Sequence, residues 1–261
     1  MMNTADKKTT VLAFTGKGGV GKTSLSAAAV RLLSEAYPGK KILAIDADPA
    51  VGLATALGVD VDYTVDDIRK SFVQTAESGN TSAAVELLGE AKYQMFDALK
   101  ETGNVSFLAI GRPEGAGCYC KVNAYLKEII SMIAGNFDYV VIDGEAGIEQ
   151  VNRRVMEKVS HLILVSDASK KGLQVTRTIL AVAGEMVMFD KAGLIINRLP
   201  DVSVADRLDT AGLEILSLIP DDPGLAMNDI AGDSIYSLPE SSAVIQGAKQ
   251  ALKKLNLIGD V

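Results

Sequence analysis

The chain has few of the residues from which base-stacking surfaces and disulfide frameworks are built. Its 261 residues include no tryptophan, aromatic residues make up 5% of them, and there are two cysteines. So little aromatic surface argues against a protein that stacks nucleic-acid bases. The cysteines, Cys118 and Cys120, are separated by one residue, and such a pair is not a disulfide framework.

Long apolar runs and an excess of positive charge are also missing. No segment approaches the ~20 apolar residues of a membrane span, and the N-terminus lacks the apolar core of a signal peptide. A net charge of -7 disfavours a general affinity for nucleic acid or for anionic membranes. We therefore expect a cytoplasmic protein with no nucleic-acid partner and no stable membrane association.

What the sequence does contain is a regular alternation of short apolar runs and helical patterns. The runs expected to form strands are residues 11–14, 41–46, 105–110, 139–143, 161–165, 193–197 and 215–220. The alternation predicts a doubly wound α/β fold, in which a mostly parallel sheet of about seven strands has helices on both faces. We expect one domain, residues 1–261, with ligands at the carboxyl ends of the strands.

A glycine-rich loop follows the first apolar run. It reads Gly16-Lys17-Gly18-Gly19-Val20-Gly21-Lys22-Thr23, and Ser24 comes next. Glycines allow tight turns that aim backbone N–H groups at a phosphate. Lys22 would contact the β- and γ-phosphates, and the Thr23 hydroxyl can ligate Mg²⁺. The loop predicts a nucleotide site rather than a glycine-rich turn without a ligand.

Lys17 is a second cation inside the same loop. Its backbone position is expected to point the side chain away from the nucleotide that its own chain binds. The residue therefore suggests that two chains share their nucleotide sites.

Acidic residues end two of the expected strands. Asp46 and Asp48 follow the second strand, and Asp143 follows the fourth, four residues before Gly147. Carboxylates at these positions can hold magnesium-bound water or orient an attacking water. We expect Asp46 and Asp143 to reach Mg²⁺ through water, and the Gly147 N–H to sense the γ-phosphate. The alternative for each aspartate is a helix cap.

Asn197 and Arg198 follow the apolar run at residues 193–196. An amide offers a donor and an acceptor, so Asn197 can read a purine edge, and we place Asn197 and Arg198 in the nucleotide site. The alternative for Asn197 is a turn residue.

The two cysteines lie in a loop between the third strand and a helix. Thiolates are soft ligands that suit zinc, nickel, copper or iron–sulfur clusters. A closed thiolate site usually needs four of them, so a two-fold dimer in which each chain gives Cys118 and Cys120 would complete one. The alternative is two incidental thiols.

Two other features are expected to be structural. His161, the single histidine, has no ligand partner at a suitable spacing. Residues 243–258 form an amphipathic helix that carries Lys249, Lys253 and Lys254, and it is expected to pack on the sheet rather than dock on a membrane.

The loop at residues 16–23 resembles the deviant Walker A motif of the SIMIBI class, which includes the nitrogenase iron protein, MinD and ParA ATPases. The resemblance covers nearly the whole chain and implies a P-loop ATPase that converts ATP and water to ADP and phosphate. Lys17 matches the signature lysine, which crosses the dimer to the partner's nucleotide. Asp48 matches the switch I aspartate that positions water, so Lys17, Lys22 and Asp48 are the implied catalytic residues. Residues 143–149 are similar to switch II.

The Cys118-Tyr119-Cys120 sequence resembles the CooC-type ATPases that mature nickel-containing carbon monoxide dehydrogenase, and the related AcsF-type proteins that serve acetyl-CoA synthase. The resemblance implies a homodimer that holds one Ni²⁺ or Zn²⁺ between the cysteine pairs of its two chains. ATP binding would favour the closed dimer and hydrolysis would release it. The implied function is ATP-dependent nickel insertion into a client enzyme.

Two alternatives remain open. Residues 111–118 are similar to the first cluster-ligand loop of the nitrogenase iron protein, an electron-transfer ATPase. Its second cluster cysteine corresponds to Ala146 here, so a bridging 4Fe–4S cluster would have to use Cys120 instead. A MinD-like positioning ATPase is the other alternative, and it leaves the cysteines unexplained.

Overall fold

The computed structural model describes residues 8–77, 81–112, 120–144, 155–201, 203, 208–210 and 212–259, with the backbone alone at 76–77, 81–88, 120 and 121. The described strands form one sheet in the order β3-β4-β2-β5-β1-β6-β7-β8. They are β1 Thr10–Gly16, β2 Ile42–Asp46, β3 Lys100–Thr102, β4 Val105–Ala109, β5 Tyr139–Asp143, β6 Lys158–Ser166, β7 Met188–Leu199 and β8 Ile215–Pro220.

The doubly wound parallel sheet is confirmed, and each of the seven expected strands is present. The sheet also contains β3, which the sequence analysis missed. This strand pairs antiparallel with β4 at the edge of the sheet, and a turn at Gly103, with a φ of 61°, joins the two strands. Its three residues, Lys-Glu-Thr, are partly or fully exposed, so no apolar pattern marks the strand.

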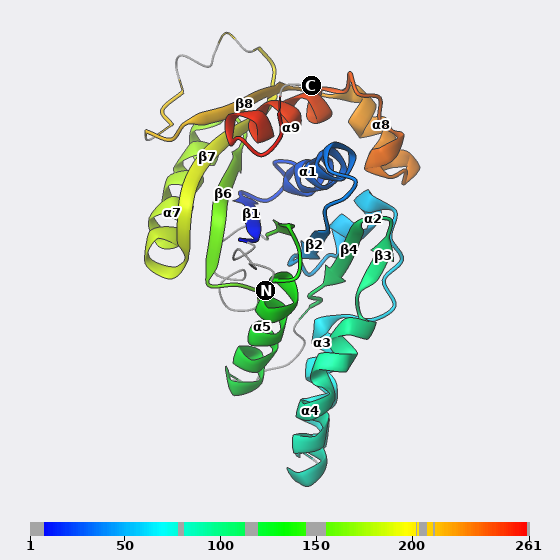
Figure 1. Ribbon diagram of the computed structural model, residues 1–261. Helices are drawn as coiled ribbons and strands as arrows, with labels where there is room; N and C mark the ends of the chain where they lie inside the picture. Colours follow the sequence, from blue (N-terminus) through cyan, green and yellow to red (C-terminus); the bar gives the residue numbers. More distant parts are fainter. Residues whose placement is uncertain are drawn as a thin grey trace, which may run out of the picture.

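Helices cover both faces of the sheet (Figure 1). The described helices are α1 Lys22–Ala36, α2 Gly52–Leu57, α3 Val65–Glu77, α4 Thr81–Asp97, α5 Cys120–Ala134, α7 Lys170–Met186, α8 Pro223–Ala231, the 3-10 turn η2 Ile235–Ser237, and α9 Ala243–Lys254. One core layer lies between the sheet and α3, α4, α5 and α7, and the other lies between the sheet and α1, α2, η2 and α9. Strands buried on both faces explain the unbroken apolar runs.

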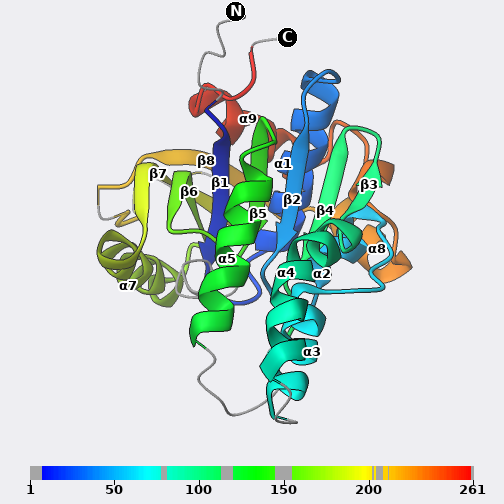
Figure 2. The same cartoon turned by 60° about the horizontal axis from the view of Figure 1, so that its bottom comes forward.

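The helices α3 and α4 form a hairpin that extends beyond the sheet (Figure 2). Its first helix begins after Thr64, whose Oγ1 accepts a hydrogen bond from the Asp67 N–H at 3.3 Å. Asp67 in turn accepts a bond from the Thr64 N–H at 2.9 Å. This reciprocal cap sets the start of α3 beside the end of β4, where the Asp66 N–H donates to the Ile110 carbonyl.

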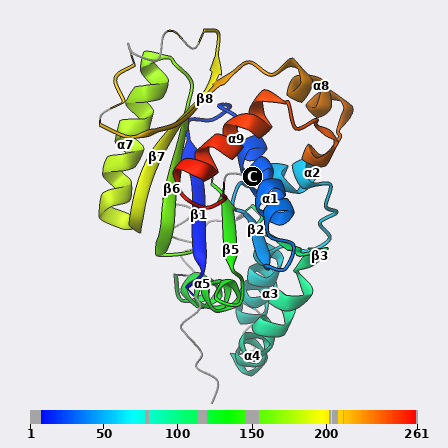
Figure 3. The same ribbon diagram turned by 45° about the horizontal axis from the view of Figure 1, so that its top comes forward.

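His161 and α9 have the structural roles expected of them. His161 is buried in β6, and burial lowers the pKa of its imidazole. The apolar side of α9 packs on β8 and α1 (Figure 3), burying Ile245, Ala248 and Leu252 among others. Among the described helices, none combines the length and apolar content needed to cross a bilayer.

Truncating the buried side of α9 should therefore reduce stability. Leu252 is 1% exposed, and Leu252→Ala is expected to lower the free energy of unfolding by about 2–5 kcal/mol, because it leaves a cavity in the core. Urea unfolding followed by circular dichroism measures this loss. Lys249→Ala is the control and should stay within about 0.5 kcal/mol of wild type. Unchanged stability of the Leu252 variant, with loss of vesicle binding, would instead indicate a membrane helix.

Candidate nucleotide-binding site

The glycine-rich loop joins β1, which lies between β5 and β6, to the start of α1. Gly16 is required where the loop leaves the sheet, because a Cβ there would lie 2.0 Å from the Val165 carbonyl oxygen. Gly21 precedes α1 in the left-handed conformation, with a φ of 91°, and has no side chain to cap the helix. The first N–H groups of α1 can therefore bind an anion, and the helix dipole favours one.

A cavity of about 410 Å³ opens above this loop. It is lined by Gly18, Gly19, Gly21, Lys22, Thr23, Asp48 and Arg198. The structure thus brings the phosphate loop together with Asp48 from the end of β2 and Arg198 from β7. Lys22 is 8% exposed, and its Nζ donates to the Lys17 carbonyl at 3.3 Å.

Asn197 has a role that the sequence analysis missed. Its Nδ2 donates to the Val20 carbonyl at 2.9 Å, and the side chain is 5% exposed. A Cβ on Gly21 would lie 2.5 Å from the same Nδ2, so Gly21 leaves the space that the amide occupies. Asn197 therefore supports the phosphate loop from a neighbouring strand. Its recognition of the base stays a prediction.

Asp46 and Asp143 lie side by side at the ends of β2 and β5, which pair in register at these residues. Both are fully buried. Burial raises the pKa of Asp143 to about 6, although hydrogen bonds from Thr23 and Ser26 oppose the shift. Burial and the charge of Asp143 raise the pKa of Asp46 to about 7. Two neighbouring carboxyls with raised pKa values form a site that favours a cation.

The oxygen atoms here fit Mg²⁺. The Oδ1 of Asp143 accepts a hydrogen bond from Ser26 at 3.1 Å, whereas its Oδ2 is buried without a hydrogen-bond partner. Mg²⁺ prefers such hard oxygen donors and keeps several of its waters. Thr23 would ligate the ion directly and Asp143 through a water. The two oxygens of Asp46 accept backbone N–H groups of Asp48 and Leu53, and its contact with Mg²⁺ stays a prediction.

Lys17 turns toward the start of α7 and is not among the residues that line the cavity. Its Nζ lies 3.1 Å from Oδ2 of Asp167, which follows β6. Asp167 also accepts a hydrogen bond from the Ser169 N–H at 3.1 Å, and Ser169 caps α7. The side chain of Lys17 therefore lies outside the phosphate cavity of its own chain, and its contact with a partner's nucleotide stays a prediction.

Three predicted site residues are not placed by the structure. Cys118 and Gly147 lie outside the described residues, and Cys120 is the first residue of α5 but its side chain also lies outside them. The chain that leads to the cysteines leaves the sheet beside Asp46, where the Ile110 N–H donates to the Asp46 carbonyl. Within the described part of the chain, no three His, Cys, Asp or Glu residues are grouped closely enough to hold a metal ion.

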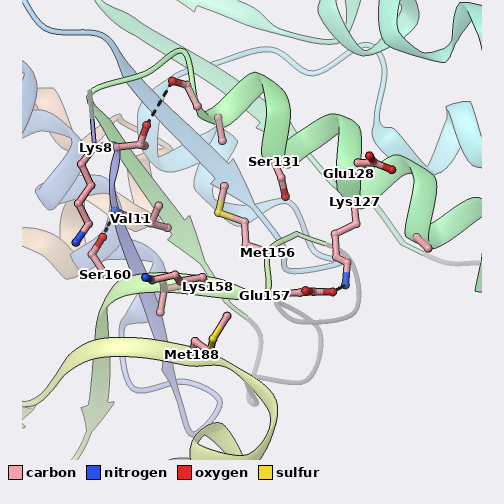
Figure 4. A pocket seen from close by; sticks show the side chains of 15 residues that line it. Lys8, Val11, Lys127, Glu128, Ser131, Met156, Glu157, Lys158, Ser160 and Met188 are labelled. Carbon is pink, nitrogen blue, oxygen red and sulfur yellow. Dashed lines mark hydrogen bonds and ion pairs between the residues drawn. The ribbon is translucent and has the colours of Figure 1, made fainter. Parts of the chain in front are cut away.

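A larger cavity of about 730 Å³ lies at the opposite edge, between α5 and the starts of β1, β6 and β7 (Figure 4). Two pairs of its lining residues bind one another. The Val11 N–H donates to Ser160 Oγ at 3.0 Å, and Lys127 forms an ion pair with Glu157 at 2.6 Å. Parallel α/β sheets bind ligands at the carboxyl ends of their strands. We therefore assign the nucleotide to the smaller cavity.

The buried carboxyls predict a dependence of stability on pH. Their folded pKa values, about 6 and about 7, exceed the ordinary value of 3.8, so folding favours the protonated forms. Without Mg²⁺, the stability they contribute is complete below pH 4 and is lost as the pH rises through 6 and 7. Asp143→Asn should therefore raise the free energy of unfolding at pH 8 by roughly 1–3 kcal/mol, and by less at pH 5.

Urea unfolding at pH 5 and pH 8, with and without Mg²⁺, measures this effect. Mg²⁺ should stabilise the wild-type chain at pH 8 more than the variant. The same substitution at exposed Asp229 is the control. A stability difference for Asp143→Asn that is the same at both pH values would contradict the assignment.

Similar proteins include one that is named as ATP-binding, which supports the assignment of a nucleotide site. The chain is 34% identical over 249 residues to an uncharacterized ATP-binding protein of Methanocaldococcus jannaschii, covering 94% of this chain and 98% of that protein. It is 29% identical over 238 residues to the carbon monoxide dehydrogenase accessory protein CooC of Rhodospirillum rubrum, covering 87% and 89%.

A solved structure shares the fold. The septum site-determining protein MinD of Pyrococcus horikoshii, complexed with Mg-ADP, superposes with a TM-score of 0.65 at 22% identity, covering 95% of this chain and 96% of that one. The family model of the CobQ/CobB/MinD/ParA nucleotide binding domain matches residues 11–235, which contain the whole site. The chain belongs to this family of nucleotide-binding proteins and is an ATP-binding protein of the MinD/ParA/CooC kind.

Proposed function

We propose that this protein is an ATP-hydrolysing maturation factor that inserts nickel into a client enzyme such as carbon monoxide dehydrogenase or acetyl-CoA synthase. The observation that carries the proposal is the cysteine pair, Cys118 and Cys120, on the segment that leads from the end of β4 into α5. The likeness to CooC over most of both chains supports it. A nucleotide site uses oxygen and nitrogen donors, whereas thiolates suit a soft metal ion, so a metal cargo would account for the cysteine pair.

Hydrolysis follows from the groups around the phosphate cavity. Lys22 and the N–H groups at the start of α1 bind the phosphates, and Asp48 at the cavity wall orients the attacking water. The water attacks the γ-phosphorus, the bond to the β–γ bridging oxygen breaks, and ADP and phosphate result. Bound Mg²⁺ supplies positive charge that stabilises the transferring phosphoryl group.

Lys17 links hydrolysis to assembly. In the single chain its ammonium group is paired with Asp167, outside its own cavity. Both side chains are about one-third exposed, so the ion pair contributes little to stability and is easily exchanged. In a closed homodimer Lys17 would contact the nucleotide of the partner. A cation supplied in this way is worth about 10³–10⁵ in rate.

The nickel ion is the cargo of this cycle. ATP would close the dimer and bring two cysteine pairs together, so that four thiolates hold one Ni²⁺ or Zn²⁺ between the chains. After hydrolysis the chains separate and the ion loses half of its ligands. The ion is then free to pass to the client.

A positioning ATPase is the second candidate, favoured by the shared fold with MinD. In such a protein the ATP cycle would control attachment to a membrane or scaffold. The apolar side of α9 is already used in the core, and Lys254 of the same helix donates a hydrogen bond to the Ile215 carbonyl at 2.6 Å.

Mixing two inactive variants tests whether Lys17 acts across a dimer. A chain with Lys17→Ala and a chain with Asp48→Ala should each be inactive. In a mixed dimer, one site has its own Asp48 and receives Lys17 from the partner. An equal mixture should regain about one quarter of the wild-type ATPase rate, because half of the dimers are mixed and each has one complete site. No gain over the separate variants would show that Lys17 acts within its own chain.

Replacing both cysteines tests the cargo site. The variant Cys118→Ser with Cys120→Ser should bind Mg·ATPγS with unchanged affinity but lose the nickel that the wild type binds per dimer, since serine hydroxyls are hard and weak ligands. Metal titration followed by thiolate-to-nickel absorption measures the loss. Unchanged nickel stoichiometry would reject the proposal. Iron and a cluster absorption band after anaerobic purification would favour an electron-transfer ATPase instead.

A further inference from the structure

The segment that carries Asp48 contains a strained residue. Val51 has a φ of 52° and a ψ of 38°, and it stands immediately before α2. A left-handed conformation costs a residue with a Cβ about 1–2 kcal/mol, and a β-branched side chain makes it rarer still. Such a conformation persists only where surrounding contacts hold the backbone in place.

Asp46 makes hydrogen bonds on both sides of Val51 that hold the backbone in this conformation. Its Oδ1 accepts a hydrogen bond from the Asp48 N–H at 3.0 Å, and its Oδ2 accepts one from the Leu53 N–H at 2.8 Å. The carboxyl is fully buried at the end of β2. The two oxygens of one carboxyl group thus bridge both ends of residues 48–53.

Contacts within the segment and with the phosphate loop complete the arrangement. The Ala50 N–H donates to Asp48 Oδ1 at 2.9 Å, and the Val51 N–H donates to the Asp48 carbonyl at 3.1 Å. A Cβ on Gly52 would lie 3.5 Å from Thr23 Cγ2, so the segment rests against the residue expected to ligate Mg²⁺. Asp48 lines the phosphate cavity, whereas Asp46 does not.

We propose that Asp46 is a positioning residue, whose carboxylate holds the strained segment 48–53 and thereby sets the place of Asp48 beside the phosphates. Asp46 then acts on hydrolysis through the backbone rather than through the metal. The inference rests on the ATP hydrolysis proposed above, but not on nickel insertion. The inference gives different roles to the two carboxyls paired across β2 and β5. Asp46 supports Asp48, whereas the unpartnered Oδ2 of Asp143 would reach Mg²⁺ through a water.

The variant Asp46→Asn tests this role. Its amide keeps one acceptor, but its NH₂ group faces a backbone N–H, so one end of the segment is released. We expect kcat to fall roughly 10- to 100-fold, because a small displacement of a catalytic group has effects of this size. The Kd for Mg·ADP and the Mg²⁺ concentration for half-maximal activity should stay within about two-fold of wild type. Asp143→Asn is the matched comparison, and it should raise the Mg²⁺ concentration needed for half-maximal activity.

A second substitution distinguishes positioning from a general structural defect. Val51→Gly removes the left-handed penalty, so the segment needs less support from Asp46. The double variant Asp46→Asn, Val51→Gly should recover at least about five-fold in kcat over Asp46→Asn alone, a non-additive effect. Val51→Gly alone should remain within about three-fold of wild type.

Hydrogen exchange at the Leu53 amide gives a readout that does not need activity. Its protection should be lost in Asp46→Asn and kept in Asp143→Asn. If the wild type does not hydrolyse ATP, the proposed function fails, and this measurement alone decides the role of Asp46. An Asp46→Asn variant that keeps Leu53 protection, that requires more Mg²⁺ as Asp143→Asn does, or that is not rescued by Val51→Gly would overturn the inference.

Discussion

Two buried carboxyls on adjacent strands are the constraint around which this molecule is arranged. The parallel register of β2 and β5 places Asp46 directly beside Asp143, and neither is exposed to solvent. Burial raises the pKa of both carboxyls, and the charge of Asp143 raises that of Asp46 further. Both oxygens of Asp46 accept hydrogen bonds from backbone N–H groups, whereas Oδ2 of Asp143 has no hydrogen-bond partner. In the roles proposed above, Asp46 supports the backbone of residues 48–53, and the unpartnered oxygen of Asp143 serves the cation.

The phosphate loop depends on this arrangement and on a neighbouring strand. Gly16 and Gly21 let the loop pass close to β6 and to the Asn197 amide, where any side chain would collide. Asn197 then holds the loop through Val20, and Ser26 of α1 binds Asp143. The loop, the acidic pair and the strand end at β7 are therefore connected by short hydrogen bonds.

Much of this could be predicted from the sequence. Seven strands could be predicted because a sheet covered on both faces requires unbroken apolar runs. The strand β3 was missed because its three polar residues lie at an exposed edge of the sheet. The cavity residues Lys22 and Thr23 could be predicted because phosphate binding restricts the residue types and spacing of the loop, and Asp48 because it follows the end of an expected strand. Three hydrogen bonds that organise the site could not be predicted from the sequence. Lys17–Asp167, Asn197–Val20 and Ser26–Asp143 join residues 150, 177 and 117 positions apart, and local patterns carry no signal of such partners.

The central claim is that ATP controls both the assembly of two chains and the capture of one metal ion between them. Native mass spectrometry of the purified protein with Ni²⁺ and Mg·ATPγS measures both at once, since each bound species adds its own mass. The account predicts a dimer with two nucleotides and one nickel ion, and metal-free monomers when nucleotide is left out. A monomer that binds Mg·ATPγS but no nickel would contradict it.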